Sequence, residues 1–358
     1  MKNVRRNKNK NINPKQVNPN NLAKAETKFT IPIRTYTEEI LKKIIIGQDD
    51  FIKKVTTAIY RRLLFNISGN ILIVGGSGSG KTETLKCLAE ILDIPYTIES
   101  ATEYTQSGYV GNDIEDIVDN LYKNAKSRGK LNKLEMAGIV IMDEIDKKAE
   151  NTKGSVGGDV AGKAVQQRLL KFMDGMPCET YDEEDGYIVR IHTENLIFIC
   201  IGAFEGLDEI RKERLNNKNI GFHVQKKDES DKQYTEADFI KYGMIKEFMG
   251  RFDCIAETNK LSIADFEKII ETSHISAFKK YKEILKEQNI EVEYSEKLIS
   301  NIAKKAHKMN VGARAIKSVV NTIFENILCD IMDNPDKKYS ICRLNDDIAY
   351  DNTMYVLE

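Results

Sequence analysis

The stretch that decides the fold runs from residue 75 to residue 82 and matches the pattern G-x-x-x-x-G-K-[ST]. The apolar run Ile71–Val74 precedes it, and a helical pattern over Lys81–Leu92 follows it. A phosphate-binding loop requires this context, because glycines turn backbone N–H groups toward an anion and the helix N-terminus adds partial positive charge. Lys81 can reach the β- and γ-phosphates of a nucleotide, and the Thr82 hydroxyl can hold Mg²⁺. The predicted nucleotide-binding residues are Gly75, Gly76, Ser77, Gly78, Ser79, Gly80, Lys81 and Thr82.

Composition limits the class of protein. The 358 residues are enough for about two domains, and a net charge of −1 gives no general attraction to nucleic acid or anionic membranes. The longest apolar run, Leu196–Phe204, is too short to span a bilayer, and no signal peptide is visible. The six cysteines form no C-x-x-C pair and the four histidines show no ligand spacing. We therefore expect a cytoplasmic protein without a zinc site.

The chain divides into three segments. Residues 1–35 form a basic tail rich in Asn and Lys without hydrophobic periodicity, for which we expect disorder. Such a tail either contacts a partner or is a solvated extension, and its composition favours the extension. Residues 36–260 are expected to form a large nucleotide-binding domain, and residues 261–358 a smaller one.

Within residues 36–260, a helix, turn and helix are predicted over Tyr36–Leu64, followed by strands and helices in alternation. Short apolar strands between helices are typical of a parallel sheet that helices cover on both faces. Long polar excursions are expected at Glu179–Tyr187 and Leu215–Thr235. The strands are Ile71–Val74, Tyr96–Glu99, Gly138–Met142 and Leu196–Ile201, and the helices are Lys81–Leu92, Asp113–Ser127 and Val160–Met173. The predicted fold class is α/β.

After about Leu261 the pattern becomes mainly helical, which predicts a separate α+β domain. A short strand over Glu291–Tyr294 interrupts the helices, and two later segments, Lys338–Arg343 and Met354–Leu357, are candidates to pair with it. The predicted helices are Ile263–Thr272, Ser276–Glu287, Ser295–Lys308 and Ala313–Met332.

Two acids follow the apolar strand at Ile139–Met142. The carboxyl end of such a strand lies beside the phosphate-binding loop, where Asp143 would complete the Mg²⁺ shell with Thr82. Glu144 would polarise the attacking water. A small-molecule kinase needs no such second acid, because its substrate hydroxyl replaces water. The alternative is an exposed acidic turn, but the position relative to the loop favours ATP hydrolysis.

The residues alone do not decide the roles of three side chains. Phosphoryl transfer needs added positive charge, often from an arginine finger, and Arg251 and Arg314 are candidates. Each is equally explained as a surface salt-bridge arginine, which is the default. Tyr109 lies between glycines in a polar loop, where composition favours a turn with a tucked ring.

Several segments, in order from Tyr36 to the C-terminus, resemble the ClpX family of AAA+ protein unfoldases. The resemblance implies an AAA+ P-loop fold, with a parallel sheet flanked by helices and a smaller α+β C-terminal domain. It also implies ATP and Mg²⁺ as cofactors. The segments are Ile46–Gln48, the phosphate-binding loop, Gly108–Gly111, Met142–Lys147, Val165–Lys171, Leu196–Cys200, Gly202–Phe204, Glu247–Arg251 and Gly312–Arg314.

The resemblance also implies roles for individual residues. Arg251 would be the finger that completes a neighbouring subunit's site, and Arg314 the second sensor that links nucleotide state to rotation of the small domain. Gly154–Gly162 would be a second pore loop. The remaining implied sites are the adenine contacts Ile45 and Ile46, the substrate-gripping pore loop Tyr109, Val110 and Gly111, and the peptidase-docking tripeptide Ile220, Gly221 and Phe222.

These roles imply a homo-hexamer that acts on protein substrates and docks on a ClpP-type peptidase, with no membrane or nucleic-acid partner expected. Some features depart from the family pattern. We expect the family's N-terminal four-cysteine zinc domain to be absent, because the sequence shows no four-cysteine pattern. Acidic residues over Glu179–Asp185 replace the expected basic motif, which puts the family's usual peptide tags in doubt. His223 stands where a glycine is usual, and no polar first sensor ends the strand Leu196–Ile201.

Two other classes compete with this interpretation. A free-standing protein remodeller or a nucleic-acid motor could use the same fold without a peptidase. Near-neutral charge and the Tyr109 loop argue against the nucleic-acid motor. A nucleotide-gated scaffold would not hydrolyse ATP, and Lys81, Asp143 and Glu144 argue against it.

Overall fold

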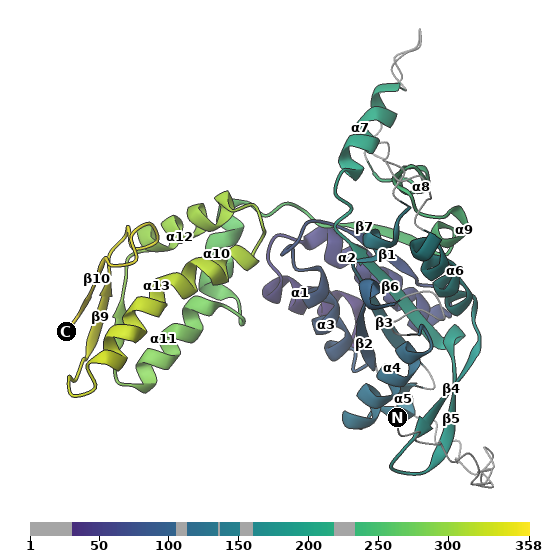
Figure 1. Ribbon diagram of the computed structural model, residues 1–358, viewed down its shortest axis with the longest axis horizontal. Helices are drawn as coiled ribbons and strands as arrows, with labels where there is room; N and C mark the ends of the chain where they lie inside the picture. Colours follow the sequence, from purple (N-terminus) through teal and green to yellow (C-terminus); the bar gives the residue numbers. More distant parts are fainter. Residues whose placement is uncertain (1–30, 105–112, 135–136, 151–159, 218–232) are drawn as a thin grey trace, which may run out of the picture.

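The computed structural model describes residues 31–104, 113–134, 137–150, 160–217 and 233–358. A five-stranded sheet with its helices forms one unit, and a helical unit with a small sheet forms the other (Figure 1). In the described ranges, no helix is both long enough and apolar enough to cross a membrane.

The large unit is built on a parallel sheet with strand order β2-β3-β6-β1-β7. Every residue of β1 and of β6 is buried, as expected of strands that are covered on both faces. Because β1 lies between β6 and β7, the loop that follows it lies between the ends of other strands. The strands are β1 Ile71–Val74, β2 Tyr96–Ser100, β3 Gly138–Asp143, β6 Leu196–Gly202 and β7 Cys254–Glu257.

Alternation along the strands divides the core into two layers. Ile71 and Ile73 of β1 face one hydrophobic cluster, whereas Leu72 and Val74 face the other, because successive strand residues point to opposite faces. The first layer is made with α1 Arg34–Ile44, α2 Asp49–Phe65 and α3 Lys81–Ile91, and the second with α4 Asp116–Ser127, α6 Val160–Asp174, α8 Glu236–Tyr242 and α9 Lys246–Met249. Two further helices are α5 Leu131–Leu134 and α7 Leu207–Asn217.

The structure corrects one expectation about the loops. The acidic stretch at Glu179–Tyr187 is not an irregular excursion but part of an antiparallel hairpin, β4 Pro177–Asp182 and β5 Tyr187–His192. Alternate residues of β4 are buried, namely Cys178, Thr180 and Asp182, so one face of the hairpin packs on the protein. Of the other predicted excursion, residues 218–232 lie outside the described ranges.

The smaller unit has its own hydrophobic core. Its three-stranded sheet has the order β10-β9-β8. The predicted pairing of the first late segment with the earlier strand is confirmed, whereas the second late segment, β10, pairs with β9 and not with β8. Serine side chains cap three of its helices, for example Ser262 Oγ, which accepts from the Asp265 backbone N–H at 3.2 Å. The elements are α10 Ile263–Thr272, α11 Ala277–Glu287, β8 Glu291–Glu293, α12 Glu296–Lys308, α13 Arg314–Asp333, β9 Ile341–Leu344 and β10 Tyr355–Leu357.

Candidate nucleotide-binding site

The loop after β1 has the backbone geometry that its glycines allow. Gly78 and Gly80 adopt φ of +70° and +90°, in the left-handed region that favours glycine. The loop leads directly into α3, which begins at Lys81. Lys81 is 9% exposed, and its ammonium donates to the carbonyl oxygens of Gly75 at 2.6 Å and Gly76 at 2.7 Å. Burial lowers the pKa of Lys81, and the nearby Asp143 carboxylate partly offsets this effect. The lysine is therefore held inside the loop, where its ammonium is placed to donate to the oxygens of a bound phosphate group.

The predicted metal-binding pair is brought together at this loop. The Thr82 hydroxyl, on the first turn of α3, donates to Asp143 Oδ2 at 3.2 Å. Asp143 ends β3 and also accepts the Glu144 backbone N–H on Oδ1 at 2.8 Å. A hydroxyl and a carboxylate next to a phosphate-binding loop are the hard oxygen donors that Mg²⁺ prefers. The residues present therefore fit a magnesium-bound nucleotide.

Glu144 adopts a left-handed backbone conformation, with φ +58° and ψ +33°. This conformation is uncommon for a residue with a side chain and costs free energy, so the surrounding structure must impose it. Its carboxylate accepts a hydrogen bond from Ser100 Oγ at 3.4 Å. Ser100 ends β2 and pairs in register with Asp143 of β3. Sequence reasoning missed Ser100, although a polar residue ending the strand beside the two acids was a usable signal.

Asp146 is a second residue that sequence reasoning missed. It is 6% exposed, lines the same cavity, and accepts the backbone N–H of Phe204 at 3.3 Å. Burial raises the pKa of Asp146, and Lys147 and the backbone N–H donors of Ala203 and Phe204 oppose that rise. The carboxylate thereby ties the segment after β3 to the turn after β6. Its position three residues after Asp143 gave no hint that it would be buried.

The small unit closes the other side of the site. The Ala313 backbone N–H donates to the Gly78 carbonyl at 2.9 Å, and Arg314 Nη1 donates to Ser77 Oγ at 3.0 Å. The cavity between the two units has a volume of ≈ 590 Å³. Arg314 opens α13 and lines this cavity together with the loop, both acids after β3 and the segment that joins α10 to α11. The structure thus brings Arg314 to the predicted nucleotide site.

Arg251 does not line the cavity of its own chain. It lies in the turn between α9 and β7, with a half-exposed side chain that binds Asp174 at the end of α6. Its Nη2 lies 3.2 Å from Asp174 Oδ2. An exposed arginine away from its own site has the position that a contribution to a neighbouring subunit would require.

The other predicted residues lie partly inside and partly outside the ranges that the structure describes. Ile45 is 7% exposed, and the Cβ of a residue larger than glycine at position 80 would lie 3.6 Å from its Cγ2. Ile46 is half-buried, and neither isoleucine is among the residues that line the cavity. Several predicted residues fall outside the described ranges, namely Tyr109, Val110 and Gly111, most of Gly154–Gly162, and Ile220, Gly221 and Phe222.

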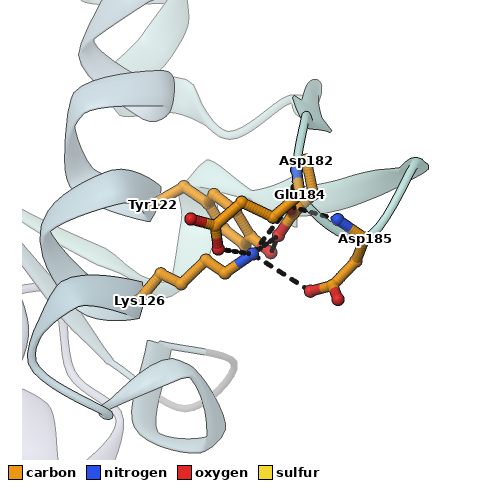
Figure 2. Close-up of polar contacts among 5 residues, drawn as sticks. All are labelled: Tyr122, Lys126, Asp182, Glu184 and Asp185. Carbon is orange, nitrogen blue, oxygen red and sulfur yellow. Dashed lines mark hydrogen bonds and ion pairs between the residues drawn. The ribbon is translucent and has the colours of Figure 1, made fainter.

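The acidic hairpin is fixed to α4 by one lysine (Figure 2). Lys126 Nζ lies 2.7 Å from both Asp182 oxygens, 2.8 Å from Glu184 and 3.0 Å from Asp185. The Tyr122 hydroxyl donates to Asp182 Oδ2 at 2.5 Å. The hydrogen bond from Lys126 holds the pKa of Asp182 well below its usual range, with Tyr122 as the second cause. Three carboxylates share one ammonium, so the hairpin turn keeps an excess of negative charge.

A phosphate-binding loop, paired acids after the next strand but one, and an arginine from a second unit define a AAA-type nucleotide-binding protein. Residues 66–255 match the model of the AAA domain (Cdc48 subfamily), and residues 261–335 match that of the C-terminal, D2-small domain, of ClpB protein. The chain is therefore an ATPase of this class.

Comparison with curated proteins identifies the family of the chain within this class. The chain is 34% identical over 330 residues to "ATP-dependent Clp protease ATP-binding subunit ClpX" of Treponema denticola, which covers 84% of this chain and 77% of that protein. The proteins of the same description from Borrelia duttonii and Borrelia recurrentis are 33% identical, with 84% of this chain and 75% of theirs covered. The chain belongs to the ClpX family.

Proposed function

We propose that the protein is a cytoplasmic, ATP-driven protein unfoldase that works as a homo-hexamer and passes its substrates to a ClpP-type peptidase. The observation that carries this proposal is the cavity shared by two units, in which Ala313 and Arg314 contact the phosphate-binding loop directly. A nucleotide held from both sides couples its own hydrolysis to the angle between the units. We assign residues 36–260 to the large domain and 261–358 to the small domain.

In the hydrolytic step, the chain supplies positioning and charge. Lys81 would leave its two carbonyl partners for the β- and γ-phosphates, and Thr82 and Asp143 would hold Mg²⁺. The magnesium nucleotide supplies the electrophilic phosphoryl group. Glu144 would orient and polarise the attacking water, and Ser100 is placed to hold its carboxylate. Arg251 would reach the site of the next subunit and stabilise the charge on the leaving group.

Polypeptide handling rests on the family resemblance and on the named relatives. Tyr109, Val110 and Gly111 would grip the substrate in the central pore, with Gly154–Gly162 as a second contact. Ile45 and Ile46 would contact the adenine. The tripeptide Ile220, Gly221 and Phe222 would dock in apolar clefts of the peptidase, since large apolar anchors in polar loops serve that purpose.

The decisive experiment uses Glu144→Gln, which keeps the shape of the side chain and removes the charge that orients water. ATP binding should persist, while turnover should fall about 10²-fold or more. Glu271→Gln is the matched control, because Glu271 is an exposed glutamate on α10. Equal turnover of the Glu144 variant and the control would contradict the assignment.

The same variant identifies the substrate class. A Glu144→Gln hexamer that binds ATP without hydrolysing it should retain protein substrates and the peptidase in a pull-down. Stimulation of wild-type turnover by unfolded protein supports the unfoldase, whereas stimulation by DNA alone would favour a nucleic-acid motor. Absence of turnover in the wild-type hexamer would favour a nucleotide-gated scaffold.

A further inference from the structure

Three side chains with metal-binding atoms converge where α3 meets the small unit. Glu83 and Cys87 are one turn apart on α3, and His274 lies in the segment between α10 and α11. Cys87 Sγ lies 3.8 Å from Glu83 Oε1, and His274 Nε2 lies 3.7 Å from the same oxygen. All three ligand atoms lie within 4.8 Å of one another. None of these residues is among the predicted nucleotide contacts, although Glu83 also lines the nucleotide cavity.

The two separations from Glu83 fit ligands around one cation. A charge-assisted N–H···O contact is about 2.7–2.9 Å long, so the 3.7 Å between His274 and Glu83 is too long for a strong direct bond. Tetrahedral ligands at bond lengths of about 2.0–2.3 Å are about 3.3–3.8 Å apart. The two measured distances, 3.8 and 3.7 Å, fall in that range.

The donor set selects the class of metal. Thiolate, imidazole and carboxylate together suit Zn²⁺ and related transition metals, whereas Mg²⁺ prefers oxygen ligands alone. Three protein ligands leave a fourth position for water, and the exposed side of His274 keeps that position open to solvent. Burial, together with the charges of Glu83 and Glu90, raises the pKa of the Cys87 thiol to about 11. Cation binding would release its proton to solvent as the metal–sulfur bond forms.

The cluster lies next to the nucleotide cavity, which gives metal binding a functional consequence. α3 begins at Lys81 of the phosphate-binding loop, and the residues after His274, Ile275 and Ser276, line the nucleotide cavity. We propose that Glu83, Cys87 and His274 form a binding site for a zinc-class divalent cation that ties α3 to the small unit. A cation there fixes the two units relative to each other beside the site that they share. Occupancy of the site therefore slows any ATPase cycle that requires the units to move.

Metal binding is tested first and without any activity measurement. The metal-free full chain in a phosphine reductant is titrated with Co²⁺ and then with Zn²⁺ against a chromogenic chelator. We expect one tight equivalent per chain and a thiolate-to-cobalt charge-transfer band. Cys87→Ser and His274→Gln should each weaken binding by about 10- to 100-fold or more, the range seen even for residues outside the first ligand shell. Cys329→Ser is the matched control, because Cys329 is an exposed cysteine on α13.

Unchanged affinity in the Cys87→Ser chain, or a cobalt complex without the thiolate band, overturns the proposal. Thermal melts of the metal-free variants show that they fold. The consequence is tested with ATP turnover in excess Mg²⁺. Zn²⁺ should slow the wild type at least about fivefold, the lower end of typical coupling between sites, and should leave Cys87→Ser unaffected. Equal inhibition of both proteins would show that Zn²⁺ acts elsewhere. Because binding is measured without nucleotide, its outcome is independent of the proposed unfoldase function.

Discussion

Replacing Asp174 by Asn removes the carboxylate that binds Arg251 and keeps the size of the side chain. In its proposed role, Arg251 would reach a neighbouring subunit's nucleotide only after it leaves this partner, so the contact would compete with catalysis. Asp174→Asn should therefore increase ATP turnover, whereas Arg251→Ala should nearly abolish it. Both variants remove the same contact, but we expect them to change ATP turnover in opposite directions.

The expected size follows from exposure. The side chains of Arg251 and Asp174 are 44% and 43% exposed. Solvent-exposed ion pairs contribute about 0.2–1 kcal/mol, so loss of this pair should raise the ratio of unbound to bound Arg251 by about 1.4- to 5-fold. Loss of an arginine finger costs about 10³- to 10⁵-fold in turnover. Salt screens exposed pairs, so the advantage of Asp174→Asn over the wild type should shrink as ionic strength increases.

The assay is steady-state ATP turnover of assembled hexamers at low and high salt. Asp333→Asn is the matched control, because Asp333 also ends its helix, so both variants relieve the same repulsion with the helix C-terminus. If Asp174→Asn lowers turnover as far as Arg251→Ala does, Asp174 positions Arg251 for catalysis and the competition argument is refuted.

Three further predictions concern other parts of the chain. Tyr109→Ala should leave ATP hydrolysis intact and severely slow the unfolding of a stable tagged reporter; normal unfolding per ATP would exclude the pore-loop role. Phe222→Ala should spare hydrolysis and unfolding but eliminate co-sedimentation with the peptidase, because several weak contacts per ring bind together; unchanged association would favour a free-standing remodeller. Lys126→Met should reduce the acid sensitivity of the hairpin. The lowered pKa of Asp182 gives stability that is complete at neutral pH and is lost as pH falls below about 5, so thermal melts at decreasing pH should change less in the variant.

Local patterns predicted most of the fold. The strand Ile71–Val74 has the predicted bounds, because an apolar run between turn residues and a glycine-rich loop leaves little choice. The serine-capped helices of the small unit also begin where capping residues precede apolar periodicity. The phosphate-binding loop and the two acids at the end of β3 were predictable because the carboxyl ends of parallel strands meet at one edge of the sheet, which places the acids beside the loop.

Contacts between distant segments were not predictable in this way. The sequence of the hairpin indicated a polar loop. The contact that holds its acids in place is with Lys126, which lies 56 residues from Asp182 in the chain and gives no local signal. The pairing of Arg251 with Asp174 spans 77 residues, and His274 meets Glu83 only after the two units pack. Such pairs depend on how elements pack, and a single sequence carries no periodic signal for them.

The contact between the loop and the small unit offers a route by which nucleotide state would reach the rest of the molecule in the proposed function. A Cβ at Gly78 would lie 2.6 Å from the Val311 carbonyl, and one at Gly312 would lie 2.4 Å from the Ser77 carbonyl. The nearest atoms on both sides are backbone atoms, so the two segments contact each other directly through their backbones. Loop amides that turn toward a phosphate must shift the Gly78 carbonyl, and the Ala313 N–H that it accepts must follow or break. In the proposed function the small unit would therefore sense the loop directly, and Arg314 would add a charge that responds to the phosphates themselves.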